Sequence, residues 1–164
     1  MQYYPFYVHN WSIQAAAPQH CGVLLFEGFS THCLANTTEP LRAANMISGK
    51  PLYEWKFLSL DRHPVTSSSG LQVTPHATLA TASGGPLIVM PSYGFLNHGG
   101  WRTLAALRSA AKRFSPLVGM DTGSWLLAEA GLLDQYQATI HWEELTNFAE
   151  RFPEVDAQRE RFIE

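Results

Sequence analysis

One stretch of the chain predicts its architecture: Pro116-Leu-Val-Gly-Met-Asp-Thr-Gly-Ser-Trp-Leu-Leu-Ala-Glu-Ala-Gly131 is typical of an apolar strand that turns sharply into a helix. Within it, Gly119-x-Asp121-x-Gly123 has the outline of a nucleophile elbow, where two glycines permit a tight turn that presents the central side chain. Elbow enzymes place serine or cysteine at this centre, whereas a carboxylate is a poor nucleophile for acyl transfer. The pattern therefore predicts the geometry of an elbow without its usual chemistry.

Two roles for Asp121 are open at this point. Aspartate is a favoured N-cap, so Asp121 could do no more than satisfy one amide of the following helix, unless Thr122 or Ser124 caps instead. The other role is contact with a ligand, because open α/β sheets bind ligands at the carboxyl ends of their strands. We favour the ligand-contacting role for this reason. In either role, an anion at the first turn of a helix is stabilised by roughly 0.3–1 kcal/mol when exposed.

Composition limits the class of protein. The 164 residues, 46% of them hydrophobic and 15% charged, fit one domain with a substantial core. A net charge of −3 offers no basic surface for nucleic acid, so any DNA binding requires another segment. The first twenty residues lack the features of a signal peptide, and no apolar run is long enough to span a membrane. These features predict a cytoplasmic protein that does not bind membranes.

Metal and phosphate chemistry are not expected. Cys21 and Cys33 have no metal-ligand spacing, and the seven histidines show no HxH or HExxH pattern. Glu27 and Gly28 follow the first apolar run, where a single glycine does not make a phosphate-binding loop. The prediction is a site without metal and without cofactor.

Strand and helix patterns alternate along the chain. Residues 1–20 are aromatic and unpatterned, and are expected to form an N-terminal arm that could bind a partner, ahead of one domain over 21–164. Strands are expected at 22–26, 53–60, 84–91, 138–141 and from 158 onward, a hairpin at 65–73, and helices at 31–47, 101–114, 125–130 and 142–152. Pro40 is expected to kink or restart the first helix. Such alternation predicts a flavodoxin-like three-layer α/β/α sandwich with a mostly parallel central sheet.

Seven motifs spread over the chain give it a specific resemblance. They are Glu39-Pro-Leu-Arg-Ala-Ala-Asn45, Tyr53-Glu-Trp55, Ser68-Ser-Gly-Leu71, Asp121-Thr-Gly123, Leu127-Ala-Glu-Ala-Gly-Leu-Leu-Asp134, Ala138-Thr-Ile-His-Trp142 and Phe148-Ala-Glu-Arg-Phe-Pro153. Together they resemble the ThiJ/PfpI superfamily, and within it the class I glutamine amidotransferase-like sensor domain of GlxA-type AraC-family transcriptional regulators. The resemblance implies a homodimer that reaches DNA through a C-terminal helix-turn-helix region that this chain does not contain.

The resemblance also bears on catalysis. Catalytic relatives carry a cysteine at the elbow, a histidine about twenty residues later and an acidic residue after the first strand. Here Asp121 stands at the elbow, His141 at the histidine position and Cys33 at the acidic position, so only the histidine is retained. A hydrolase of this kind needs a nucleophile beside a base, and Asp121 beside His141 is expected to form a charged or hydrogen-bonded pair instead. We therefore expect no enzyme activity. The alternatives are an amidase-like or hydratase-like enzyme acting through Cys33 or Asp121, and a purely structural interaction domain.

The remaining expectation concerns the effector. The resemblance implies a small cationic metabolite such as betaine, carnitine or a basic amino acid, which a carboxylate and aromatic faces would both attract. Simpler interpretations are open for three of the predicted residues: Trp142, like Trp125, could pack in the core, Cys33 could be a small buried residue, and His141 could be a core histidine. The loop over 92–95 is expected to line the pocket, and the predicted ligand-binding residues are Cys33, Tyr93, Gly94, Asp121, Thr122, Gly123, His141 and Trp142.

Overall fold

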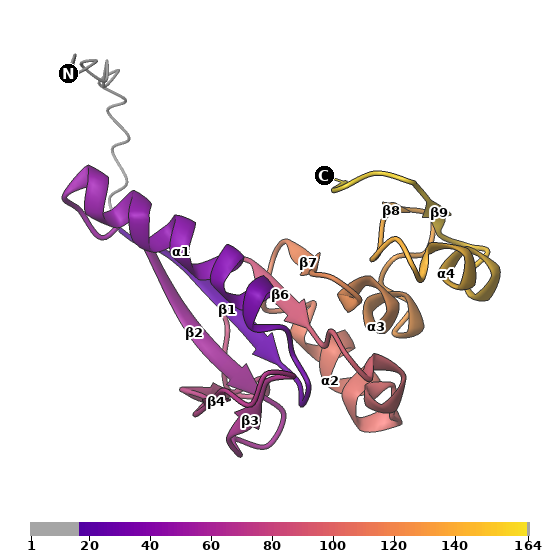
Figure 1. Ribbon diagram of the computed structural model, residues 1–164, viewed down its shortest axis with the longest axis horizontal. Coiled ribbons are helices and arrows are strands. Elements are labelled where there is room, and N and C mark those ends of the chain that lie inside the picture. Colours follow the sequence, from indigo (N-terminus) through magenta and orange to yellow (C-terminus); the bar gives the residue numbers. More distant parts are fainter. Residues whose placement is uncertain (1–16, 164) are drawn as a thin grey trace, which may run out of the picture.

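Five parallel strands form the central sheet of the chain, whose computed structural model describes residues 17–163 (Figure 1). Residues 1–16 of the predicted arm lie outside the described residues. The strand order is β5-β2-β1-β6-β7, from β5 (Ala77–Thr78), β2 (Tyr53–Ser59), β1 (Gln19–Leu25), β6 (Leu87–Met90) and β7 (Leu117–Gly119). The chain builds outward from β1 in one direction and then in the other, so the topological switch point lies between β1 and β6. Open α/β sheets bind ligands beyond the carboxyl ends of strands at such a point.

Helices cover both faces of the sheet, which confirms the three-layer prediction. Successive side chains of a strand point to opposite faces. Val23 and Leu25 accordingly join a cluster beneath α1 (Thr31–Ser48). Leu24 and Phe26 join the cluster under α2 (Trp101–Ala110), α3 (Gly123–Glu129) and α4 (Leu145–Arg151). The apolar run of β1 is continuous because both of its faces are buried.

Small elements complete the fold. The predicted hairpin is confirmed as the antiparallel pair β3 (Val65–Thr66) and β4 (Gln72–Val73). A 3₁₀ turn, η1 (Phe95–His98), lies in the loop after β6. None of the helices within residues 17–163 combines the length and the apolar character needed to cross a membrane.

The C-terminal strands differ from the prediction. β8 (Gln137–Ala138) stops short of the predicted 138–141, and it pairs with β9 (Asp156–Ala157) outside the main sheet. The reason for the early stop is that the His141 amide donates to the Asp121 carbonyl, 3.0 Å away, which takes the backbone away from a strand ladder. Within the described residues, β9 is the last strand, and it ends at Ala157. The strand expected from 158 onward is therefore wrong.

Two helix predictions also need correction. α1 runs as one helix through Pro40, so the predicted restart is wrong. Proline removes one backbone donor, and the carbonyl left without it belongs to Asn36, which is exposed to water. α2 ends at Ala110, four residues before the predicted end at Phe114, whose buried ring packs with the core after the helix has ended.

Candidate functional site

The elbow predicted from the glycine spacing is present. β7 ends at Gly119, α3 begins at Gly123, and Asp121 between them has a φ of 60°, in the left-handed region that most residues avoid. A β-carbon at Gly119 would lie 2.5 Å from the Ser124 amide nitrogen, and one at Gly123 would collide with the Val89 carbonyl oxygen. Both glycines are therefore required by close backbone approach, and the turn holds Asp121 at the carboxyl end of the sheet.

Asp121 does not cap the following helix. Thr122 is the N-cap residue of α3, but its side chain accepts no hydrogen bond from the helix amides, and its hydroxyl donates to the Ser92 carbonyl at 2.9 Å. This bond ties the loop after β6 to the loop after β7 at the carboxyl end of the sheet. Within residues 17–163, the one hydrogen-bond donor to the Asp121 carboxylate is the Cys33 thiol, whose Sγ lies 3.8 Å from Oδ2. Asp121 is thus a half-buried carboxylate with one weak donor.

Cys33 reaches the site from the first turn of α1. Its amide donates to the hydroxyl of the N-cap residue Ser30 at 3.3 Å, which fixes the start of the helix. Burial raises the pKa of the Cys33 thiol; the Ser30 hydroxyl opposes this rise, and the Asp121 charge adds to it. The sulfur therefore stays protonated at neutral pH and donates to Asp121, which is the opposite of an activated thiolate.

Ser92 begins the loop over 92–95 that the sequence predicts as part of the pocket lining, although no individual role was predicted for its hydroxyl. It follows β6, is 3% exposed, and has a φ of 52°. Its hydroxyl lies near enough to Cys33 to lower the pKa of the thiol, yet it forms no hydrogen bond of normal geometry with any described residue. Buried hydroxyls are normally paired. The only signal in the sequence was its position directly after a buried strand that ends at the carboxyl edge of the sheet.

His141 contacts Asp121 through the backbone only. Its amide donates to the Asp121 carbonyl, while its ring Nδ1 lies 3.8 Å from the Glu143 carboxylate. The predicted side-chain pair between Asp121 and His141 is wrong, because no hydrogen bond or ion pair joins these two described side chains. The bond at the backbone instead fixes the elbow from a second side.

The predictions for the two tryptophans near the site have different outcomes. Trp125 is 9% exposed and packs in the core as predicted. Trp142 is 74% exposed, so the core interpretation is wrong for this residue, whose indole lies beside the His141 ring with 5.7 Å between centroids. Tyr93 is 66% exposed, and Gly94, the N-cap residue before η1, has a φ of 69°. Tyr93 and Trp142 are the sequence neighbours of Ser92 and His141, and among the described residues no hydrogen bond joins either side chain to Asp121.

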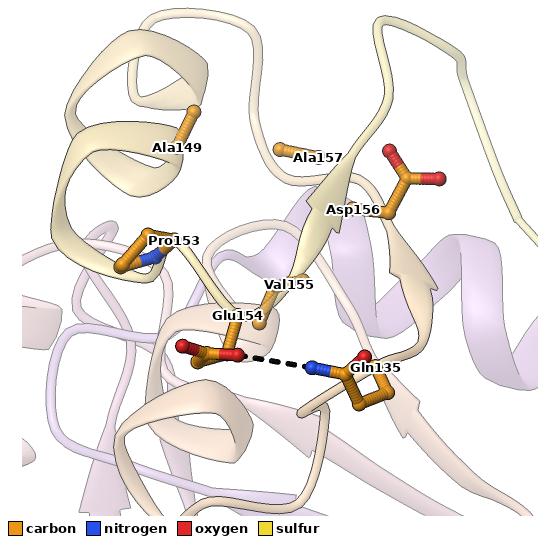
Figure 2. Close-up of a pocket in the computed structure, with 7 residues that line it drawn as sticks. All are labelled: Gln135, Ala149, Pro153, Glu154, Val155, Asp156 and Ala157. Atoms are coloured by element: carbon orange, nitrogen blue, oxygen red, sulfur yellow. Dashed lines mark hydrogen bonds between the residues drawn. The ribbon is translucent and has the colours of Figure 1, made fainter.

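Two hollows lie away from this site. The larger, about 440 Å³, is bordered by α4 and β9, and Figure 2 shows the Gln135 amide bonded to Glu154 across its edge at 3.0 Å. The smaller, about 260 Å³, lies at the amino end of β1 beside His20 and Glu54. Neither contains a residue of the predicted site. Across residues 17–163, no group of three or more histidine, cysteine, aspartate or glutamate side chains is placed to hold a metal ion.

Comparison with known proteins identifies the group to which the chain is similar. No family model matches it. It is 42% identical to the HTH-type transcriptional regulator GbdR of Pseudomonas aeruginosa over 139 residues, 84% of this chain and 38% of the regulator. It is 34% identical to the regulator GlxA of Rhizobium meliloti over 159 residues, 88% of this chain and 45% of GlxA. The chain thus spans less than half the length of these regulators.

An enzyme is also among the relatives. The chain is 37% identical to isonitrile hydratase of Pseudomonas putida over 91 residues, which are 54% of this chain and 38% of the hydratase. The regulators are matched over a larger part of the chain.

Solved structures share the fold. A crystal structure of an AraC family transcriptional regulator from Pseudomonas putida superposes with a TM-score of 0.72 at 25% identity, covering 90% of this chain and 80% of that one. A ThiJ/PfpI family protein from Pseudomonas syringae gives 0.73 at 24% identity, covering 90% and 60%. The chain therefore shares the fold of ThiJ/PfpI proteins and belongs, over the domain that it matches, with the GlxA-type AraC-family transcriptional regulators.

Proposed function

We propose that this chain is the ligand-sensing domain of an AraC-family regulator and that Asp121 binds a small cationic metabolite of the betaine, carnitine or basic amino acid type. The observation that carries the proposal is the Asp121 carboxylate, which is half buried at the carboxyl end of the sheet with one thiol donor at 3.8 Å. A carboxylate taken partly out of water gains from a cationic partner. A cation bound at this position would supply that partner.

The surroundings suit a small cation. Thr122 and Gly123 hold the elbow rigid, and Cys33 closes one side of the carboxylate. The exposed faces of Tyr93 and Trp142 offer cation–π attraction of roughly 0.5–2 kcal/mol to a cation within reach. His141 positions Asp121 from the backbone, and its own ring is turned to Glu143.

The enzyme alternative rests on the similarity to isonitrile hydratase and on the Cys33 sulfur. A nucleophilic cysteine needs a lowered pKa and a base. The pKa of Cys33 is instead raised by burial and by the Asp121 charge, and the thiol donates its proton to the carboxylate. These features support a site that recognises a ligand without catalysis.

The same proposal extends to the full-length regulator. We propose that it acts in the cytoplasm as a homodimer, and that it binds DNA through a helix-turn-helix region outside this chain. Two-fold symmetry of such a dimer would match paired half-sites.

Calorimetry with betaine, carnitine, arginine and related amines tests the ligand. We expect binding by the wild-type chain and a loss of at least about tenfold in affinity for Asp121→Asn, equivalent to 1.4 kcal/mol. The matched control is Asp134→Asn, which makes the same change at an exposed turn and should leave affinity unchanged. Absence of any binder in the panel, or equal loss in both variants, would contradict the proposal.

Turnover assays separate sensor from enzyme. The sensor proposal predicts no steady conversion of amide, ester or isonitrile substrates by the wild-type chain. Conversion that disappears in Cys33→Ala or Asp121→Ala would establish the enzyme alternative instead.

A further inference from the structure

The hydroxyl of Ser92 differs from the other buried hydroxyls of the molecule. Thr37 donates to the Cys33 carbonyl at 2.9 Å, and Ser59 accepts from the Arg62 amide at 2.8 Å. Across residues 17–163, the Ser92 hydroxyl oxygen is the one fully buried side-chain nitrogen or oxygen without a hydrogen-bond partner. An unpaired buried polar group costs free energy, so one that is retained points to a partner that binds.

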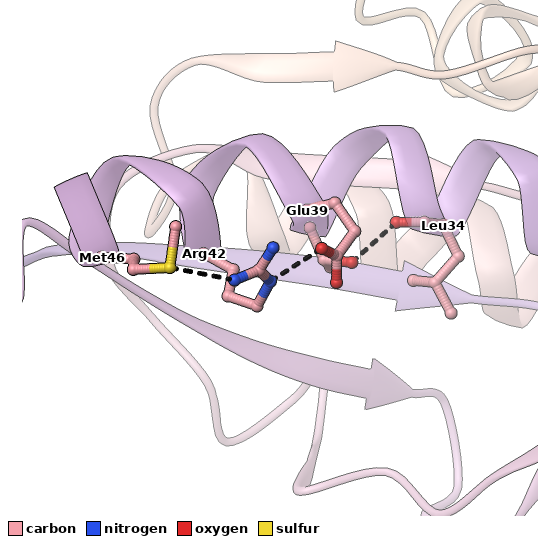
Figure 3. A network of polar contacts seen from close by, with 5 residues as sticks. Leu34, Glu39, Arg42 and Met46 are labelled. Carbon is pink, nitrogen blue, oxygen red and sulfur yellow. Dashed lines mark hydrogen bonds and ion pairs between the residues drawn. The ribbon is translucent and has the colours of Figure 1, made fainter.

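Polar side chains are paired even on the exposed side of α1, the helix that carries Cys33. Figure 3 shows Arg42 between Glu39 and Met46, with its Nε 2.7 Å from the Glu39 carboxylate and its Nη1 4.0 Å from the Met46 sulfur. Both members of this ion pair are more than half exposed. They are satisfied within their own helix and need no outside partner, in contrast to Ser92.

The backbone at Ser92 strengthens this contrast. Its φ of 52° lies in the left-handed region, where glycine is the residue without a steric cost. The Thr122 hydroxyl fixes the loop in this conformation by donating to the Ser92 carbonyl. Glycine at position 92 would remove both the backbone strain and the unpaired hydroxyl. A serine that keeps both is expected where its hydroxyl has a function.

The hydroxyl lies beside the proposed ligand site. It lowers the pKa of the Cys33 thiol, which is the effect of a donor, because a hydrogen bond to the sulfur stabilises the thiolate. The same sulfur lies 3.8 Å from Oδ2 of Asp121. One sulfur atom therefore lies beside both a hydroxyl donor and a carboxylate, and a ligand that displaces this sulfur meets both groups.

We propose that the Ser92 hydroxyl donates a hydrogen bond to the carboxylate of a zwitterionic effector whose cationic group pairs with Asp121. The inference rests on the proposed sensing function and assigns a second contact in that site. A carboxylate in the site attracts the positive half of a zwitterion and repels the negative half. A hydroxyl donor beside it offsets this repulsion, since hydrogen bonds to ionised acceptors are the stronger ones. Because Ser92 and Asp121 flank one sulfur atom, the two charges of the effector are only a few bonds apart.

Calorimetry with matched ligands tests the contact. Glycine betaine and tetramethylammonium both carry a quaternary ammonium group, but only betaine has a carboxylate; arginine and agmatine form a second such pair. The wild-type chain should bind the carboxylate-bearing member of at least one pair about tenfold more tightly, and Ser92→Ala should reduce this preference by at least about fivefold, because a hydrogen bond to a charged group is lost. Asp121→Asn should weaken the binding of both members.

Two further variants separate recognition from a structural role. Ser59→Ala is the matched control, because Ser59 is also 3% exposed but its hydroxyl is paired with the Arg62 amide. It should leave the ligand preference unchanged and lower the melting temperature by about 2–4 °C. Ser92→Ala should not lower the melting temperature of the ligand-free chain, because it breaks no hydrogen bond. Ser92→Gly suits the positive φ and should lose the preference in a chain that folds without strain.

The outcomes are separable from those of the sensing proposal. Equal affinity of the wild-type chain for both members of each pair, or a preference that Ser92→Ala leaves intact, would reject the Ser92 contact alone, provided that binding depends on Asp121. A melting temperature lowered as much by Ser92→Ala as by Ser59→Ala would also reject it, since the hydroxyl would then have a structural partner. Binding of no member of either pair would contradict both proposals.

Discussion

The two faces of the central sheet are unequal. On the side of α2, α3 and α4, one cluster contains nineteen buried residues, and α3 buries six consecutive positions from Gly123 to Ala128. On the α1 side the corresponding cluster contains six, and α1 contributes only Leu34 to it. The larger cluster supplies most of the apolar burial that stabilises the fold. The thinner face places Cys33 beside Asp121 and leaves the outside of α1 free.

A pair of leucine truncations tests this asymmetry most strongly. Leu126 in α3 is fully buried, whereas Leu34 in α1 is 8% exposed. Leu126→Ala should lower the free energy of unfolding by about 2–5 kcal/mol, because a cavity remains among packed neighbours. Leu34→Ala should cost less, about 2 kcal/mol or below, since α1 can settle onto the sheet. Urea denaturation measures both, and equal losses would show that the faces are equally packed.

A smaller effect is expected where the two loops of the site are joined. Thr122→Val removes the hydroxyl that donates to the Ser92 carbonyl and should cost about 1 kcal/mol of unfolding free energy. Thr38→Val is the matched control. The Thr38 hydroxyl donates to the Leu34 carbonyl inside α1, and that oxygen also accepts a backbone hydrogen bond of the helix, so it keeps a donor in the variant. The control should cost less than half as much. The reverse order would mean that the loops are held together by other contacts.

The smallest expected effect concerns the reactivity of Cys33. Burial raises the pKa of this thiol and the Asp121 charge raises it further, so removing the charge lowers the pKa and increases the thiolate fraction at pH 8. Asp121→Asn should therefore speed alkylation by iodoacetamide about two- to tenfold, since one pKa unit corresponds to tenfold.

Mass spectrometry assigns the labelled cysteine. Cys33→Ser measures the slow background from Cys21, which is buried and whose pKa burial also raises. Slower labelling of Asp121→Asn would contradict the assignment of the carboxylate as the acceptor of the thiol proton.

Local patterns were sufficient for the elements near the elbow. The strand before Gly119, the turn at Asp121 and the helix after it were all predicted, because the two glycines and the apolar run act within a few residues of one another. The strand prediction over 138–141 failed because a bond to the Asp121 carbonyl, outside any local pattern, claims the His141 amide. Trp142 was predicted to bind ligand, with core packing as the alternative, and its neighbours in sequence did not reveal that it is 74% exposed.

The alternation of buried strands with amphipathic segments was enough to specify three layers and a parallel sheet, since apolar periodicity records which faces must be buried. It could not specify that Cys33, Ser92 and Asp121 would meet. Cys33 and Asp121 are 88 positions apart, and they are brought together because parallel strands β1, β6 and β7 end on one edge at the switch point. Which side chains share that edge is decided by strand order and register, and hydrophobic pattern carries information about neither.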